Sequence, residues 1–427
     1  MNYKEVLAYM FSQLPMYQRI GAAAYKADLN NTIQLLHLLG NPERAFRSVH
    51  IAGTNGKGSV SHYLASVFQE AGYKTALYTS PHLKDFRERI KINGEMIPKW
   101  EVSRFINAHQ ADFERLQPSF FEMTVGLAFD YFRNQKVDIA IIETGMGGRL
   151  DSTNVIQPEV SVITNIGLDH TQFLGNTFAE IATEKAGIIK AKTPVVLGEK
   201  QAETEAIFRA MAAKLEASIV FTNEHFSIQQ CLQKENLCCD VYLNNDLYLK
   251  NLYSELKGVY QLKNMLTVLQ TLEVLKHRGF NINEDSIRKG FAKVIQLTGL
   301  LGRFQQLGDQ PLVIADTAHN EAGLRIVLKQ FYSLAHKEMR FVLGMVNDKD
   351  IKKMLRMFPV HAHYYFCKPD IPRGLDAEVL AKEAKDVGLI GRVFSSVKKA
   401  LRVARLDADT DDIIYVGGST FVVAEVV

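Results

Sequence analysis

The chain has 427 residues, of which 47% are apolar and 23% are charged. This composition is typical of a globular protein and excludes a disordered or fibrous chain, and the length exceeds one ordinary core, so we expect two α/β domains. The formal charge of +3 comes from 50 basic and 47 acidic side chains spread along the chain, which argues against a protein that coats nucleic acid.

Neither the cysteines nor the apolar segments indicate export or membrane insertion. The cysteines show no C-x-x-C spacing, so the sequence predicts neither a zinc site nor a disulfide framework. No apolar run approaches membrane-spanning length, and the start MNYKEVLAYMF carries charged residues at helical spacing rather than a signal-peptide pattern. We therefore expect a cytoplasmic protein with no membrane partner. The cysteines are Cys231, Cys238, Cys239 and Cys367.

The first part of the chain alternates strand-like runs with helix-length segments. This alternation predicts a doubly wound, mostly parallel sheet with right-handed crossovers. Residues 222–257 contain short polar and aromatic runs, which predict antiparallel strands or an elaborated sheet edge, and residues 260–279 predict a long helix. The strand-like runs are residues 48–53, 74–80, 137–143, 159–166, 193–198 and 218–222.

A second alternation begins after linker-like glycines within residues 296–302. A helix is expected to start at His319, and two helical segments are expected before the last strand. We therefore predict an α/β protein with two domains, residues 1–297 and a smaller Rossmann-like domain of residues 298–427. The strand-like runs of the second domain are residues 311–316, 339–346, 361–366 and 412–418.

The segment GTNGKGS, residues 53–59, joins the first strand of the sheet to a helix. The generic phosphate-loop pattern G-x-x-x-x-G-K-[ST] fails at both ends, because Ile51 takes the place of the first glycine and Gly58 separates Lys57 from Ser59. The glycines still allow backbone N–H groups to face a phosphate, while Lys57 adds a charge and the Ser59 hydroxyl can reach a metal. A plain glycine turn is the alternative, but Gly-Lys-Gly-Ser directly after a strand favours phosphate binding.

Ionisable residues follow two later strands. Glu143 ends one apolar strand, and Asp169 and His170 follow the next. Ligands of open α/β sheets bind at the carboxyl ends of strands, so we expect a site there. On chemistry alone, Glu143 could be a solvated strand end and His170 could cap a turn, because magnesium prefers oxygen ligands. Lys185, beside Glu184, would be part of an ordinary charged helix.

A set of motifs follows in a fixed order: GTNGKGS at 53–59, IIETGMGGRLDSTNV at 141–155, LDHTQFLG at 168–175, EKAGIIK at 184–190, GRF at 302–304, DTAHN at 316–320 and GGSTFVVAEV at 417–426. Together they resemble the folylpolyglutamate synthases and dihydrofolate synthases of the Mur ligase superfamily. The resemblance covers nearly the whole chain. It implies a ligase that uses ATP and Mg2+ to join L-glutamate to a pterin carboxylate through an acyl phosphate. It also implies that residues 1–297 form a P-loop ATP-binding domain with folate-site loops, followed by a C-terminal ligase domain.

The resemblance assigns roles to nucleotide-site residues in both domains. Arg303 would contact the phosphates of ATP, Asn264 its adenine and Asp316 its ribose side. His319 would be catalytic as well, although it could equally cap a helix. The nucleotide-binding residues implied are Thr54, Asn55, Gly56, Lys57, Gly58, Ser59, Asn264, Arg303, Asp316 and His319.

The resemblance also implies a metal site and a modified lysine. Ser59, Glu143 and His170 would bind magnesium ions. The lysine that matches Lys185 is carbamylated in relatives, forming N6-carboxylysine, which requires a neutral amine and hence a pKa lowered by burial. The catalytic residues implied are Lys57, Glu143, His170, Lys185 and His319.

A pterin-side pocket follows from the same resemblance. Residues 78–90 match a loop over the active site, whereas residues 120–132 are first of all a core helix in which Glu122 is exceptional, because unpaired carboxylates avoid apolar sites. Residues 21–26, GAAAYK, would join this pocket. The folate- or dihydropteroate-binding residues implied are Ser80, Pro81, His82, Leu83, Phe121, Glu122, Arg149, Leu150 and Asp151.

Two other classes of protein use comparable loops. A cell-wall Mur ligase usually carries GTNGKTT or GTKGKT and an N-terminal sugar-nucleotide domain, and a P-loop switch or motor NTPase shows an N-K-x-D motif or coiled-coil heptads; the sequence matches neither. Within the folate branch, SPHL at 80–83 resembles bacterial members that use both dihydropteroate and tetrahydrofolate. We predict a bifunctional enzyme, with folylpolyglutamate synthase alone as the alternative. We expect small-molecule substrates only, no nucleic-acid partner and a monomer.

Overall fold

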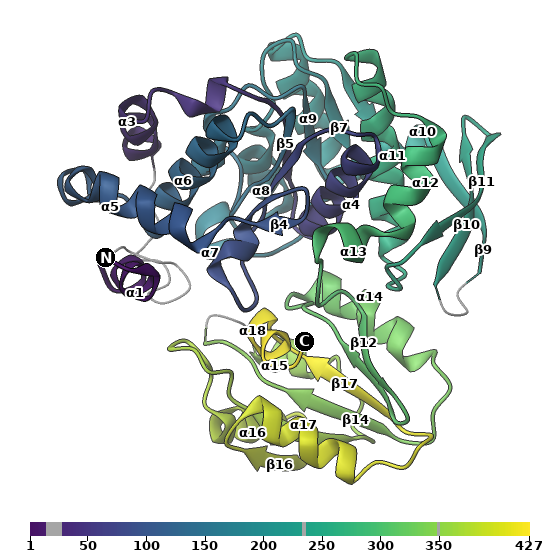
Figure 1. Cartoon of the computed structure of the whole chain (residues 1–427). Coiled ribbons are helices and arrows are strands. Elements are labelled where there is room, and N and C mark those ends of the chain that lie inside the picture. Colours follow the sequence, from purple (N-terminus) through teal and green to yellow (C-terminus); the bar gives the residue numbers. More distant parts are fainter. Residues whose placement is uncertain (14–27, 233–235, 348–350) are drawn as a thin grey trace. The chain divides into compact units, whose positions relative to one another are not determined.

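The computed structural model describes residues 1–13, 28–232, 236–347 and 351–427 (Figure 1). They form two compact units, the first of Met1–Glu255 with Gln261–Gly299, and the second of Leu256–Tyr260 with Leu300–Val427. The short segment Leu256–Tyr260 thus belongs to the second unit, although the chain on either side of it belongs to the first. The chain therefore crosses between the units at three places.

The first unit is built on an eight-stranded sheet in the order β4-β3-β2-β5-β1-β6-β7-β8. The strands β2, β5, β1, β6, β7 and β8, which follow one another in this order, pair in parallel. The strands β3 and β4 extend the edge beyond β2 with antiparallel pairs. The predicted mostly parallel sheet is confirmed. The strands are β1 (Arg47–Ala52), β2 (Thr75–Tyr78), β3 (Ile90–Ile92), β4 (Glu95–Met96), β5 (Ile139–Glu143), β6 (Val160–Ile163), β7 (Val195–Leu197) and β8 (Ile219–Phe221).

Helices cover both faces of this sheet, as expected of a doubly wound fold. The chain moves along the sheet in one direction from β1 to β2 and in the other from β2 to β5, so right-handed crossovers place α4 and α6 on opposite faces. The α6 residues Val125 and Phe129 share a core with Ala140 and Ile142 of β5. The helices of this unit other than the single-turn ones are α1 (Tyr3–Gln13), α3 (Asn30–Leu38), α4 (Lys57–Glu70), α5 (Lys99–Leu116), α6 (Phe120–Asn134), α8 (Phe178–Ala186), α9 (Ala202–Lys214), α11 (Gln261–His277), α12 (Glu284–Ala292) and α13 (Val294–Thr298).

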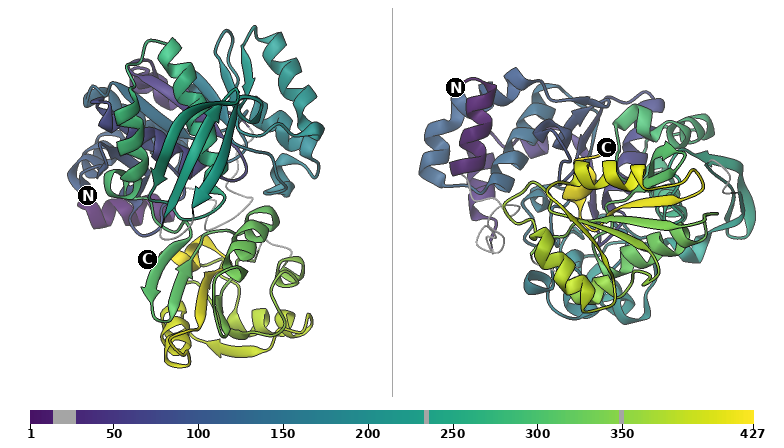
Figure 2. Two further views of the ribbon diagram at one scale, coloured as in Figure 1. Left: turned by 90° about the vertical axis from the view of Figure 1, so that its right-hand side faces the viewer. Right: turned by 90° about the horizontal axis from the view of Figure 1, so that it is seen from below.

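The region between the last strand of the large sheet and α11 forms a small antiparallel sheet, which confirms the change of pattern expected there. Its order is β11-β10-β9, and the left view of Figure 2 shows the three strands side by side. The strands are β9 (Phe226–Leu232), β10 (Leu237–Leu243) and β11 (Asp246–Ser254). The single-turn helices of the first unit are η2 (Pro42–Arg44), η3 (Phe86–Arg89), η4 (Ser152–Val155), α7 (Thr171–Leu174) and α10 (Thr222–His225).

The second unit has a six-stranded sheet in the order β12-β13-β17-β14-β15-β16, parallel except for β12. Separate apolar clusters cover it, one built with α14 and α16 and the other with α17 and α18. The predicted α/β domain is confirmed, with β12 and β16 as strands that the sequence did not predict. The elements are β12 (Gln305–Asp309), β13 (Leu312–Ala315), α14 (Glu321–Tyr332), β14 (Met339–Leu343), α15 (Ile351–Leu355), β15 (His363–Cys367), α16 (Ala377–Lys385), β16 (Gly391–Phe394), α17 (Val397–Leu406), β17 (Ile413–Gly417) and α18 (Thr420–Ala424).

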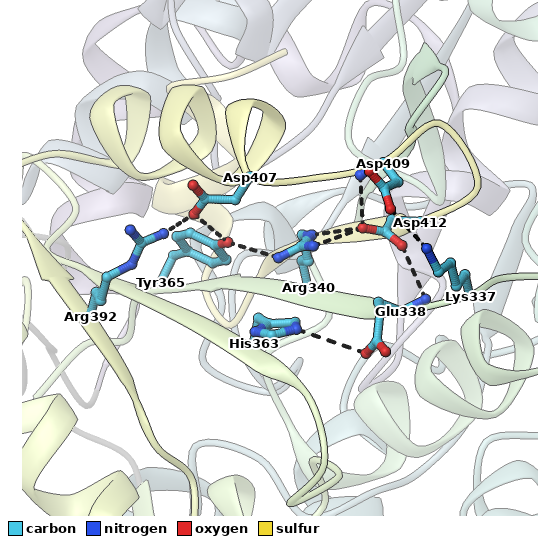
Figure 3. A network of polar contacts seen from close by, with 9 residues as sticks. All are labelled: Lys337, Glu338, Arg340, His363, Tyr365, Arg392, Asp407, Asp409 and Asp412. Carbon is cyan, nitrogen blue, oxygen red and sulfur yellow. Dashed lines mark hydrogen bonds and ion pairs between the residues drawn. The ribbon is translucent and has the colours of Figure 1, made fainter.

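A polar network ties the strands of the second unit together (Figure 3). The Arg340 guanidinium donates two hydrogen bonds, of 3.1 and 2.8 Å, to one oxygen of Asp412, and the pair is almost fully buried. Arg340 also donates to the Tyr365 hydroxyl, which in turn donates to Asp407. Burial opposes ionisation of Asp412, but the bonds from Arg340 hold its pKa below the ordinary value.

In the part of the chain that the structure describes, no helix has the length and apolar character needed to cross a membrane.

Candidate active site

The loop between β1 and α4 can be formed only by glycine at two positions. Gly53 and Gly56 have φ of +149° and +86°. A Cβ atom on Gly53 would lie 1.9 Å from Thr164 Oγ1, and one on Gly56 would lie 2.4 Å from Asn264 Oδ1. The loop therefore packs directly against two side chains and delivers the chain into the first turn of α4, whose N–H groups have no acceptor within the helix.

The first half of this loop is fixed by the segment that follows β6. The N–H of Thr54 donates to the carbonyl of Asn165, and the N–H of Asn55 donates to the Asn165 side chain at 3.1 Å. The Thr54 hydroxyl donates to the carbonyl of Gly167 and accepts from its N–H. These two N–H groups hold the loop in shape, which leaves the N–H groups at the start of α4 as the donors suited to an anion.

Two lysines that are distant in the sequence contact the same atom of the loop. Lys57 Nζ donates to the carbonyl oxygen of Gly53 at 3.0 Å, and Lys185 Nζ, from α8, donates to the same oxygen at 2.9 Å. Lys185 is 3% exposed. Burial, followed by the nearby charge of Lys57, lowers the pKa of Lys185 to about 7, while Asp169 and Asp151 act in the opposite direction. The motifs around residues 57, 151, 169 and 185 therefore converge on one place.

The predicted metal ligand Ser59 ends a buried series of hydrogen bonds between side chains. Gln261 Nε2 donates to Ser59 Oγ at 3.1 Å, and Asn264 Nδ2 donates to Gln261 Oε1 at 2.8 Å. Each of the three residues is at most 6% exposed. Asn264, the predicted adenine contact, is thus linked through one residue to Ser59, and its side-chain oxygen lies against Gly56.

The other predicted metal ligands end or follow the two parallel strands on either side of β1. Glu143 is the last residue of β5 and is 4% exposed, and its carboxylate accepts from the N–H of Ser80 at 3.2 Å. His170 precedes α7 with φ of +50°, and its N–H donates to the Asp169 carboxylate at 2.9 Å. Within the described residues, no three His, Cys, Asp or Glu side chains gather as a metal site; the predicted ligand set contains only two such residues.

The loop after β2 is organised around a buried arginine. Arg89 is 3% exposed, and its Nε donates to His82 Nδ1 at 2.8 Å. Burial and the Arg89 charge lower the pKa of His82 to about 3, so the imidazole is neutral and accepts this bond. The N–H groups of Leu83 and Asp85 donate to the Glu88 carboxylate, which closes the turn. Ser80, Pro81, His82 and Leu83 therefore belong to one ordered loop that begins beside Glu143.

The predicted pocket residues on α6 have structural partners. Phe121 packs against Gly145, because a Cβ there would lie 2.5 Å from the ring. Glu122 accepts from the N–H of Ser119 at 2.6 Å, and its own N–H donates to the Ser119 hydroxyl, so the two residues form a capping box at the start of α6. This contact explains why a carboxylate is buried in an apolar helix, and the S-x-x-E pattern in the sequence was the signal for it.

The RLD segment contributes residues with different environments. Arg149 is exposed and pairs with Glu184 at 2.8 Å. Leu150 follows it, and Asp151 is buried, accepting from the N–H groups of Met146 and Thr153. Burial raises the pKa of Asp151 above its ordinary value, against the effect of these hydrogen bonds. Residues 21–26, which the resemblance adds to this pocket, lie outside the described residues.

In the second unit, the predicted nucleotide contacts follow β13. Asp316 is 2% exposed and accepts from the Tyr260 hydroxyl at 2.6 Å and from the N–H of Phe304 at 2.7 Å. Burial raises the pKa of Asp316. Arg303 donates to the Thr317 hydroxyl, and His319 Nδ1 lies 3.0 Å from the Thr317 carbonyl. His319 is not the cap of α14, because Asn320 occupies that position and accepts from the N–H of Gly323.

Sequence reasoning did not single out three residues that contact predicted site residues. Arg89 is the buried partner of His82, Gln261 the partner of Ser59, and Tyr260 the partner of Asp316. Tyr260 and Gln261 lie shortly before Asn264, in the segment YQLKN. The contacts of Tyr260 and Gln261 join residues far apart in the sequence, which no local pattern reveals, whereas Arg89 and His82 lie in one loop.

Two family models match the chain. Residues 51–272 match the Mur ligase middle domain, and residues 302–420 match the domain described as Mur ligase, glutamate ligase domain. In sequence, the chain is 34% identical to the folylpolyglutamate synthase of Lacticaseibacillus casei, covering 100% of this chain and 98% of that protein. It is 33% identical to the dihydrofolate synthase/folylpolyglutamate synthase of Bacillus subtilis, covering 94% of each.

Solved structures are similar over the full length. Escherichia coli FolC in complex with DHPP and ADP matches with a TM-score of 0.86 and 28% identity, covering 100% of this chain and 97% of that one. A folylpolyglutamate synthase of Mycobacterium tuberculosis complexed with ADP and AMPPCP matches with a TM-score of 0.87 and 29% identity, covering 99% and 97%. A bifunctional folylpolyglutamate synthase/dihydrofolate synthase with Mn, AMPPNP and L-glutamate bound matches with a TM-score of 0.85 and 29% identity, covering 100% and 97%.

Proposed function

The chain belongs to the folylpolyglutamate synthase and dihydrofolate synthase family of Mur ligases, and from this premise we propose that it is an ATP-dependent ligase that adds L-glutamate to a pterin carboxylate. The observation that carries the proposal is the loop of residues 53–59. There, the N–H groups of the first turn of α4 and the Lys57 ammonium group lie together beside the carbonyl of Gly53. Such a site suits a polyphosphate.

The reaction needs two steps, because a carboxylate has no usable leaving group. One carboxylate oxygen of the pterin acid attacks the γ-phosphorus of ATP, the bond from that phosphorus to the β–γ bridging oxygen breaks, and an acyl phosphate and ADP result. The neutral amine of glutamate then attacks the acyl carbon, loses a proton, and expels phosphate. Phosphoryl transfer depends mostly on alignment and charge neutralisation, which Lys57 and the N–H groups of α4 would supply.

We propose that Ser59, Glu143 and His170 hold magnesium ions. The Ser59 hydroxyl and the Glu143 carboxylate are oxygen donors of the kind that magnesium prefers, and both are nearly buried at the edge where β1 and β5 end. When bound, the metal would neutralise charge on the transferring phosphoryl group. His170 would contribute a nitrogen and is the least typical of the three ligands.

We propose further that Lys185 reacts with carbon dioxide to form a carbamate. The lowered pKa of about 7 leaves a substantial share of the amine neutral at neutral pH, which this addition requires. The nitrogen lone pair attacks the carbon of carbon dioxide, and one proton leaves the nitrogen. The product is an anion beside Lys57, where it would offset the positive charge and support the metal site.

The remaining roles follow the family pattern. We propose that Arg303, Asp316 and His319 of the second unit contact ATP, together with Asn264 and the loop of residues 53–59. We propose that the pterin acid is bound by residues of three segments: the loop after β2, the start of α6 and the RLD segment. The proposed pterin-site residues are Ser80, Pro81, His82, Leu83, Phe121, Glu122, Arg149, Leu150 and Asp151.

The acid substrate is proposed to be either dihydropteroate or tetrahydrofolate, which makes the enzyme bifunctional. Relatives named for both activities and a relative named for folylpolyglutamate synthesis alone are similarly close in sequence, at 33% and 34% identity. A folylpolyglutamate synthase without the dihydropteroate activity is therefore the second candidate. We also propose that the enzyme acts as a cytoplasmic monomer on small molecules.

A side-by-side assay tests this proposal. The full chain with ATP, Mg2+ and L-glutamate receives dihydropteroate in one sample and tetrahydrofolate in the other, and ADP release and the glutamylated products are measured. A bifunctional enzyme releases ADP in both samples and only when acid and glutamate are both present. Product from tetrahydrofolate alone would select the second candidate, and ADP release that ignores the acid would contradict the ligase proposal.

A further inference from the structure

Each crossing of the chain between the two units is anchored to one helix of the first unit. The crossings follow residues 255, 260 and 299. At or next to each crossing, a residue of the first unit is hydrogen-bonded to a side chain of α4; the three residues are Ser254, Gln261 and Thr298. Helix α4 packs against α11, α12 and α13 within this unit (Figure 1), and its first turn belongs to the proposed phosphate loop.

The anchors at the first and third crossings are buried hydrogen bonds. The Tyr63 and Ser254 hydroxyl groups share a hydrogen bond of 2.5 Å. His62 Nδ1 lies 2.7 Å from Thr298 Oγ1, and this hydroxyl donates its proton to the Val294 carbonyl. A hydroxyl has one proton, so the imidazole must donate to Thr298.

The anchor at the second crossing has a fixed orientation. Because Gln261 Oε1 accepts from Asn264, the amide must present its Nε2 group to Ser59 Oγ. The Ser59 oxygen keeps a lone pair for a metal and a proton for a phosphate. The preceding residue, Tyr260, donates to Asp316 of the second unit, so one peptide bond separates a partner of the phosphate loop from a partner of a predicted nucleotide contact.

The three anchoring positions share one face of α4. Residues 59, 62 and 63 are spaced three and four apart, which brings their side chains to the same side of a helix. A further side chain on this helix, Ser66, donates at 2.7 Å to the carbonyl of Gly290, which is not at a crossing. The Ser66 hydrogen bond is therefore a matched control, because it starts from the same helix but does not reach a crossing.

We propose that α4 couples occupancy of the phosphate loop to all three crossings, with His62, Tyr63 and Gln261 as positioning residues. A ligand that binds the folded first turn of α4 lowers the population of states in which this helix is locally open. Residues bonded to the same helix share that stabilisation, because they cannot open without breaking those bonds. The inference rests on the proposed function only in taking ATP as the ligand of the loop.

Hydrogen–deuterium exchange of the full chain, with and without Mg2+ and the unreactive analogue AMPPNP, tests the coupling. In the unaltered protein, nucleotide is expected to slow exchange about tenfold both in residues 53–59 and around the crossings, at 254–261 and 296–300. Tyr63→Phe is expected to keep the slowing at 53–59 and lose it at 254–256, and Thr298→Val to lose it at 296–300. Both changes remove one hydroxyl and little volume. Ser66→Ala, the control, is expected to keep the slowing at every crossing.

Steady-state kinetics provides a second readout. Tyr63→Phe and Thr298→Val are expected to leave the KM for ATP within about threefold and to lower kcat about tenfold, because nucleotide still binds but the crossings are no longer hydrogen-bonded to α4.

In the exchange experiment, the coupling would be overturned if nucleotide slowed exchange at the crossings equally in these variants and in the unaltered protein. Slowing of exchange that is confined to residues 53–59 would overturn it as well. Absence of slowing at 53–59 in the unaltered protein would instead overturn nucleotide binding itself, and the coupling with it.

Discussion

Lys57 and Lys185 donate hydrogen bonds to the same oxygen atom, the carbonyl of Gly53, at 3.0 and 2.9 Å. Their nitrogens are therefore at most about 6 Å apart. Two ammonium groups at this separation repel one another, and this repulsion adds to burial in lowering the pKa of Lys185. The carbamate proposed on Lys185 would remove this repulsion and leave the Lys57 charge, with the N–H groups at the start of α4, to bind a polyphosphate.

Lys57→Ala is expected to abolish acyl phosphate formation while the fold remains intact. The side chain supplies a charge that is needed most when negative charge moves on the transferring phosphoryl group, and loss of one such group costs about a hundredfold to a thousandfold in kcat. Phosphate release with saturating substrates measures the rate, and the melting temperature checks the fold. Undiminished turnover in a folded variant would contradict the role given to Lys57.

Lys185 is expected to make the free energy of unfolding rise with pH. Its pKa is about 7 in the folded chain, against about 10.4 when exposed. Between these values the folded state holds fewer protons than the unfolded state. The free energy of unfolding therefore rises by up to about 1.4 kcal/mol per pH unit in this window, and this group makes no further difference once the pH has fallen below 7. Denaturant titrations at pH 7, 8 and 9 should show a smaller rise for Lys185→Met. Equal rises in both proteins would contradict the depressed pKa.

Lys185→Ala is expected to lose activity that short-chain carboxylates restore in part. The substitution leaves space beside Gly53, where acetate or a similar anion can take the place of the proposed carbamate. Turnover is measured at increasing carboxylate concentration, with Lys57→Ala as the control that gains nothing. A Lys185→Ala enzyme that is fully active without added carboxylate would show that the modification is dispensable.

Asp412→Asn is expected to destabilise the second unit by about 3–5 kcal/mol, because it leaves the Arg340 guanidinium buried without its counter-charge. The two side chains are 1% and 9% exposed. The nearby pair of Lys337 and Asp409 has side chains that are 63% and 71% exposed, so Asp409→Asn is the matched control and should cost less than about 1 kcal/mol. Denaturant unfolding measures both. Equal losses would contradict the importance of burial here.

The sequence predicted the central strands well and the sheet edges poorly. Strands such as β5 and β17 are buried on both faces and contain continuous apolar runs, IAII before Glu143 and IIYVG. The strands that the sequence did not predict, β3, β4, β12 and β16, are short or lie at an edge, and β12 and β16 contain no buried residue. Edge strands lack the two-sided burial that makes a pattern visible.

For the candidate site, local patterns predicted which residues lie in loops at strand ends but not what each side chain contacts. The tight turn at the glycines of residues 53–59 could be anticipated from the predicted strand and helix on either side. The contacts Ser59–Gln261 and Tyr260–Asp316 could not, because they depend on how distant segments pack. Glu122 shows the converse case, since its capping partner Ser119 lies three residues away and is visible in the sequence.

The most direct test of the ligase chemistry follows one oxygen atom. Dihydropteroate labelled with 18O in both carboxylate positions is converted with ATP, Mg2+ and L-glutamate, and the inorganic phosphate is examined by mass spectrometry. If a substrate carboxylate takes the γ-phosphoryl group and an amine then displaces phosphate, each phosphate released must carry one labelled oxygen. Amide product accompanied by unlabelled phosphate would contradict an acyl phosphate, and with it the role assigned to the loop beside Lys57.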